Sequence, residues 1–130
     1  MTLTDRCNAV EECYEFMLAY AAQGLPAEQA TQSGGQLRHF LDRTVEALSG
    51  LAAAYSAEVP QHQAFLAVLD RDAKDSLAAI EMVLAQPALS SQLIDNLNAS
   101  IHLRALLTDL FLIDEVMKVQ RMPAKPAMGV

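Results

Sequence analysis

The chain has 130 residues, of which 52% are hydrophobic and 19% are charged. These proportions are typical of a single folded domain with its own core, and they exclude a disordered chain. Sixteen acidic residues against nine basic ones give a formal net charge of −7. A chain of that sign, without a basic cluster or tryptophan, is a poor binder of nucleic acid.

The first predicted helix covers residues 4–23 and ends before Gly24. An apolar stripe with spacings of three and four residues lines its inner side: Leu3, Cys7, Val10, Tyr14, Met17 and Ala21. Glu11, Glu12 and Glu15 lie away from this stripe. They predict a solvated acidic face, which would meet a basic partner rather than bind iron.

The second helix is less certain at its start. Pro26 suits the first turn of a helix, but Gly34 and Gly35 each weaken a helix interior by about 1 kcal/mol. We therefore expect a short helix or a loop over residues 26–36 and a firm helix starting between residues 33 and 36. Its packing seam alternates spacings of four and three residues: Leu37, Leu41, Thr44, Leu48, Leu51 and Tyr55.

The third helix is predicted from about Gln61 to Gln86, where Pro87 breaks it. A fourth helix, capped by Ser90 or Ser91, would follow.

The stretch Leu89–Val119 is the longest without proline or glycine and the most apolar. Its apolar face swings by roughly half a turn near His102, and beyond that point apolar residues cover most of the circumference. Such a helix is either buried in the core or covered by a partner. The residues expected to bind a partner are Leu103, Leu106, Leu110, Ile113 and Met117. Charged residues such as Arg104 and Asp109 exclude a membrane span.

Together these patterns predict an all-α protein, an antiparallel up-down-up-down four-helix bundle with or without a short extra helix before helix 2. The bundle would occupy residues 1–120 as one domain. Residues 121–130 contain two prolines and no apolar period, and they predict a flexible C-terminal tail.

The two cysteines, Cys7 and Cys13, are six positions apart in one helix, too far for an internal disulfide. Reduced thiols in a core are typical of a cytoplasmic protein. The N-terminus lacks a basic region followed by an apolar run, so we expect no signal peptide.

Two histidines raise the possibility of site chemistry. His39 points outward beside Arg38, as in a histidine phosphotransfer module, but the FLDRT that follows lacks the Lys-Gly pair usual in such modules. His102 lies where the apolar face switches, and a buried polar layer of Thr44, Asp72, Ser76 and His102 is predicted at that height. The layer would fix helix register, or it would hold a ligand or a metal.

The bundle lacks the Glu-x-x-His motif of di-iron proteins, and it has no phosphate loop or nucleophile elbow. We therefore assign no metal and no cofactor, and the absence of motifs favours a protein that is not an enzyme without deciding the question. The sequence favours a small cytoplasmic interaction protein, an accessory, assembly or regulatory factor that forms a homodimer or binds another protein through its helices. A ligand- or metal-binding bundle is the alternative.

Overall fold

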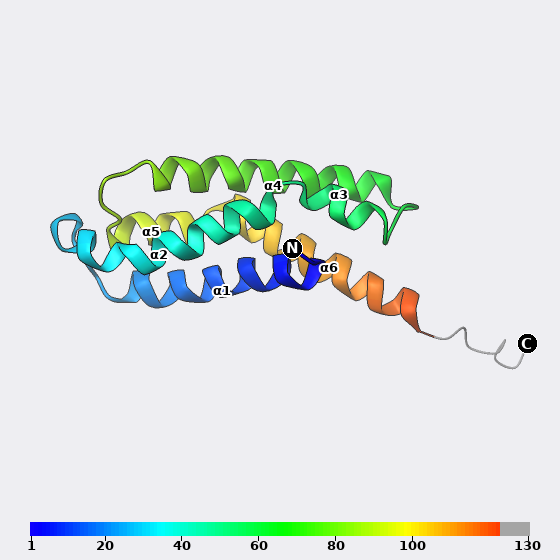
Figure 1. Cartoon of the computed structure of the whole chain (residues 1–130), viewed down its shortest axis with the longest axis horizontal. Coiled ribbons are helices and arrows are strands. Elements are labelled where there is room, and N and C mark those ends of the chain that lie inside the picture. Colours follow the sequence, from blue (N-terminus) through cyan, green and yellow to red (C-terminus); the bar gives the residue numbers. More distant parts are fainter. Residues whose placement is uncertain (123–130) are drawn as a thin grey trace, which may run out of the picture.

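The structure, a computed structural model, describes residues 1–122, apart from the side chains of residues 27–33. This part of the chain is all-helical and contains no strand, so the predicted all-α class is confirmed. Its six helices, shown in Figure 1, are α1 (Leu3–Ala22), α2 (Ala27–Leu48), α3 (Leu51–Ser56), α4 (Gln63–Leu84), α5 (Ser91–Asn98) and α6 (Ile101–Arg121).

The second predicted helix is interrupted at Gly50. This glycine has φ 73° and ψ 21°, a left-handed conformation that ends a helix and favours glycine. The packing seam continues across the interruption, because Leu48, Leu51 and Tyr55 are all buried. The prediction of a single helix through this seam is therefore wrong, although the residues predicted to face inward are buried.

The long stretch Leu89–Val119 is also divided. Ala99 ends α5, and Ser100 caps α6 by accepting a hydrogen bond from the amide of Leu103 at 3.4 Å. The break lies two residues before His102, where the apolar face of the sequence swings. The swing therefore marks the junction of two helices rather than a twist in one.

The uncertain segment 26–36 is helical from Ala27 onward. Both glycines lie inside α2. A Cβ added at Gly34 would meet only the Cδ1 of Leu89, at 4.0 Å, and one added at Gly35 would meet nothing within 4 Å. Close packing therefore does not require glycine at either position.

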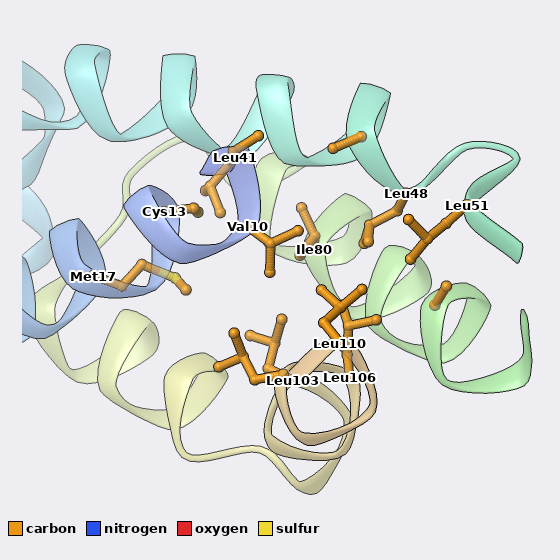
Figure 2. Packing of buried hydrophobic residues seen from close by; sticks show 14 of the residues in the cluster. Val10, Cys13, Met17, Leu41, Leu48, Leu51, Ile80, Leu103, Leu106 and Leu110 are labelled. Carbon is orange, nitrogen blue, oxygen red and sulfur yellow. The ribbon is translucent and has the colours of Figure 1, made fainter. Parts of the chain in front are cut away.

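The core is formed by side chains from every helix. Figure 2 shows residues of α1, α2, α4 and α6 pointing into one shared space, among them Val10, Cys13, Met17, Leu41, Ile80, Leu103, Leu106 and Leu110. Burial of such side chains stabilises the fold by about 25 cal/mol per Å² of apolar surface removed from water.

Polar contacts connect the ends of the helices. The Arg6 guanidinium donates to the carbonyl oxygens of Ala47 at 2.7 Å and Ser49 at 2.8 Å. Arg38 donates in the same way to the carbonyl oxygens of Leu84 and Gln86. Both arginines thus satisfy carbonyls that a helix C-terminus leaves without partners.

Tyr20 and Ser91 join α1 to α5. The Tyr20 hydroxyl donates to the carbonyl oxygen of Leu89 at 2.6 Å, and the Ser91 hydroxyl donates to the carbonyl oxygen of Tyr20 at 2.7 Å. The predicted tail at 121–130 is in part helical, because α6 includes Arg121. Residues 123–130 lie outside the described part of the chain. Within residues 1–122, no helix is long and apolar enough to cross a membrane.

Candidate functional site

The five α6 residues predicted to bind a partner lie inside the chain's own core. Leu103, Leu106, Leu110, Ile113 and Met117 each expose at most 5% of their surface. In Figure 2 the three leucines point toward side chains of the other helices. The folded chain does not offer these residues to a partner. The large apolar residues that α6 does expose are Ile101, Phe111, Leu112 and Val119.

The predicted polar layer does not assemble. Thr44 and Ser76 are buried and Asp72 is half-buried, but His102 is exposed. Because α6 begins at Ile101, His102 falls in its first turn, where it lines a shallow hollow together with Asp75 and Met82. The Thr44 hydroxyl instead donates to the carbonyl oxygen of Phe40 in its own helix at 2.9 Å and to that of Ala9 on α1 at 3.4 Å.

The residue that Asp72 does meet is Asp109 on α6. Asp109 is buried, and the Asp72 carboxyl group is its charged neighbour on α4. Burial, followed by the neighbouring Asp72 carboxyl, raises the pKa of Asp109 to about 7. The described residues contain no group of three metal-ligating side chains.

A second polar cluster joins α1, α3 and α6. The Tyr55 hydroxyl donates to the Asp114 carboxylate at 3.0 Å, and it lies 3.0 Å from the Cys7 sulfur. Burial raises the pKa of the Cys7 thiol to about 11 and also raises the pKa of Tyr55. A thiol with that pKa is protonated at neutral pH and is a poor nucleophile. The cluster therefore joins the three helices through side-chain hydrogen bonds.

The other two histidines are exposed and have no ligand set around them. His39 lies on the surface of α2, with its ring edge-on to Phe40 at 6.1 Å between centroids. His62 precedes the first turn of α4. Within residues 1–122, these positions present surface histidines and no catalytic arrangement.

A large hollow lies between α1 and α6. This α1–α6 groove has a volume of about 650 Å³ and is lined by Glu11, Tyr14, Glu15, Leu18, Arg104, Leu107, Thr108 and Phe111. Its size is within the usual range for ligand sites. Leu18 exposes 49% of its surface and Phe111 exposes 54%, so two large apolar side chains are open to solvent here.

Helical spacing explains the layout of the groove. Residues four positions apart are neighbours on one helix face. Tyr14 and Leu18 form such a pair on α1, and Leu107 and Phe111 form another on α6. Farther from the core, Glu11 and Glu15 line the α1 rim, and Arg104 and Thr108 line the α6 rim. The groove therefore has an apolar floor between polar edges.

The two rims differ in charge. Glu11 and Glu15 make the α1 rim acidic, whereas Arg104 is the charged residue on the α6 rim. Glu12, the third glutamate of this acidic face, is paired with Arg43 at 2.9 Å and is not part of the groove. No ion pair involving Glu11, Glu15 or Arg104 occurs among the described residues.

The sequence gives only a weak signal for this groove, namely two apolar residues at the edges of apolar helix faces. Leu18 and Phe111 are apolar residues at the edge of the inner faces of their helices, and a single-helix pattern does not distinguish such residues from core. Only the contact between α1 and α6 in the fold brings them together.

Comparison of the chain with protein-family models, curated proteins and solved structures gave no match.

Proposed function

We propose that this protein is an interaction module that holds an amphipathic helix of a partner protein in the α1–α6 groove. The carrying observation is the apolar floor at Leu18 and Phe111, open to solvent beside an acidic rim. Exposed apolar surface of this kind marks binding sites, and a helix with apolar residues three or four positions apart suits such a groove.

Charge selects a basic partner helix. Glu11 and Glu15 stand on one rim, and the chain carries a net charge of −7. A helix with lysine or arginine beside its apolar face would be attracted to the acidic rim and would associate faster. An acidic side chain on the opposite flank of that helix would reach Arg104.

The arrangement of helices around the groove supports this role. We interpret the six helices as four antiparallel legs of an up-down-up-down bundle, in which α2 with α3 and α5 with α6 each form one leg. In such a bundle α1 and α6 are rigid walls, so the groove exists before a partner arrives and costs little ordering on binding. The two free cysteines favour a reducing, cytoplasmic location for this module.

A direct test uses a synthetic probe. A fluorescein-labelled peptide of about 18 residues, long enough for a stable helix, would carry leucines on one face and lysines beside them. Fluorescence anisotropy would measure its Kd. We expect Leu18→Ser and Phe111→Ser each to raise the Kd about tenfold, close to 1.4 kcal/mol. Met82→Ser is the matched control, since Met82 is an exposed apolar residue on α4 and should leave the Kd unchanged.

A second pair of variants tests the acidic rim. The double variant Glu11→Gln/Glu15→Gln should weaken peptide binding, whereas Glu46→Gln/Glu81→Gln, which removes the same charge elsewhere, should not. A version of the peptide with glutamate in place of lysine should bind more weakly to the wild type. Equal binding by the wild type and both groove variants would refute the proposal.

A further inference from the structure

The outward side of α6 carries an apolar stripe separate from the α1–α6 groove. This outer stripe consists of Ile101, Ala105, Leu112, Val116 and Val119. Its members are separated by four, seven, four and three positions, the spacing of a helix-packing seam. Ile101 exposes 75% of its surface, Leu112 52% and Val119 65%. No other described element covers these three side chains.

The two ends of the outer stripe lie at equal distances from Leu110. Ile101 and Val119 lie nine positions before and after Leu110, and Thr108 and Leu112 lie two positions before and after it. When two copies of such a helix run antiparallel, Ile101 of each lies opposite Val119 of the other. Thr108 of each likewise lies opposite Leu112. In this register apolar side chains meet at the two ends of the stripe, and apolar and polar side chains alternate nearer the two-fold axis, which relates the same surface of both copies.

The charges beside the stripe are complementary in the same arrangement. Arg104 lies six positions before Leu110 and Glu115 five positions after it, on the same flank of α6. In an antiparallel pair related by a two-fold axis, like flanks meet. Arg104 of each copy therefore lies beside Glu115 of the other. Glu115 has an exposed partner in its own chain, Lys118 at 3.0 Å, and such pairs are weak enough to be shared.

Helix α6 is also balanced in charge, unlike the chain as a whole. Its three basic residues offset its three acidic residues: Arg104, Lys118 and Arg121 against Asp109, Asp114 and Glu115. The chain carries −7, and that excess therefore lies on other parts of the molecule. Two copies that associate along α6 therefore avoid most of the electrostatic repulsion that would arise between their other, negatively charged surfaces.

The shape of the surface agrees with this pairing. A hollow of about 450 Å³ lies at the C-terminal end of the stripe, lined by Leu112, Val116 and Val119 together with Gln61 and His62. The antiparallel register brings Ile101 of a second copy to this hollow. The most exposed apolar side chain of the stripe thus faces an apolar hollow.

We propose that two copies of this chain associate as a symmetric homodimer in which the outer stripes of α6 pack antiparallel. The interface shares Arg104 and Thr108 with the α6 rim of the α1–α6 groove, but it does not include the floor residues Leu18 and Phe111. It replaces the buried α6 residues, Leu103 among them, as the surface through which the chain meets itself.

Analytical ultracentrifugation of the full chain over a range of concentrations tests the proposal. We expect the wild type to be a dimer and Leu112→Asp to be a monomer under the same conditions. Leu112 is exposed, so the variant should keep the helical circular dichroism of the wild type. Val119→Asp provides an independent second variant in the stripe, and Leu18→Ser, which alters only the groove, should remain dimeric.

A charge exchange tests the antiparallel register. Arg104→Glu and Glu115→Arg should each raise the dimer dissociation constant about tenfold, because each places like charges together twice. The double variant Arg104→Glu/Glu115→Arg should restore it to within about threefold of the wild-type value. A monomeric wild type, a dimeric Leu112→Asp, or a double variant no better than the singles would each overturn the proposal.

Discussion

The buried carboxyl group of Asp109 on α6 lies against the carboxyl group of Asp72 on α4. Asp109 exposes 7% of its surface, and its Oδ2 atom has no hydrogen-bond partner among the described residues. Two neighbouring carboxyl groups, one of them buried, cannot both be ionised without a cost in free energy. One proton held between them would remove the repulsion and would supply a hydrogen bond across the α4–α6 interface.

Protonation of Asp109 should therefore make stability depend on pH. Its folded-state pKa is raised to about 7, against 3.8 for an ordinary aspartate. Between these two pH values the folded state binds more protons than the unfolded state. The contribution of Asp109 to the free energy of unfolding is therefore greatest below about pH 4 and is lost as pH rises through 7. We expect Asp109→Asn to gain stability relative to the wild type as pH rises through this window, by up to about 4 kcal/mol at its upper end.

Urea unfolding at several pH values, followed by circular dichroism, measures this gain. The comparison of the two proteins at each pH cancels the other carboxylates, whose contributions run in both directions. Asp75→Asn, at an exposed position on the same helix as Asp72, is the matched control and should show no such trend. A difference between Asp109→Asn and the wild type that stays constant from pH 4 to 8 would contradict a shared proton.

The hydroxyl group of Tyr55 should contribute measurably to stability. Tyr55 is fully buried, and its hydroxyl bridges Cys7 and the Asp114 carboxylate at 3.0 Å each. Tyr55→Phe keeps the ring but removes a charge-assisted hydrogen bond and leaves Asp114 with one partner fewer. We expect a loss of about 1–3 kcal/mol in the free energy of unfolding, measured by urea denaturation.

Tyr14→Phe is the control for this loss. Tyr14 is half-buried in the α1–α6 groove, and its hydroxyl makes no hydrogen bond within residues 1–122. Its removal should change stability by less than about 0.5 kcal/mol. Similar losses in the two variants would mean that the hydrogen bond to Asp114 contributes little.

Both thiols should resist modification in the folded protein. Burial raises the pKa of Cys7 and of Cys13 to about 11, whereas a free thiol titrates near 8.5 and reacts as the thiolate. We expect Ellman's reagent at about pH 8 to modify neither cysteine at an appreciable rate until urea unfolds the chain. Rapid modification of Cys7 in the native protein would show that its thiol is more accessible and more acidic than the packing implies.

The helical content and most of the core follow from the spacing of apolar residues. Leu37, Leu41 and Leu48 repeat at the period of a packed helix, and all three are buried. The break at Gly50 does not follow, because a single glycine inside a helical pattern is often tolerated. The left-handed conformation of Gly50 changes the chain direction between α2 and α3, and this direction is set by tertiary packing rather than by the local sequence.

The site was harder to predict than the fold for a related reason. A pairing of Asp72 with His102 requires the rotation of α6 about its own axis, and the break at Ser100 sets that rotation. The sequence signals the break through the swing of the apolar face but not its direction. The structure consequently brings Asp109, and not His102, to Asp72. In the same way, Leu18 and Phe111 become a groove only through the approach of α1 to α6.

Glycine substitutions distinguish the two kinds of glycine in this chain. Gly35 lies inside α2, and an added Cβ meets nothing within 4 Å. Gly35→Ala should therefore raise the free energy of unfolding by about 0.5–1 kcal/mol, because alanine has the higher helix propensity and narrows the unfolded ensemble. Gly50 also has open space around its Cβ position, but its φ of 73° is unfavourable for alanine. Gly50→Ala should lower stability by about 1 kcal/mol. Urea denaturation of both variants checks the pair, and equal effects of one sign would mean that backbone conformation does not decide the outcome.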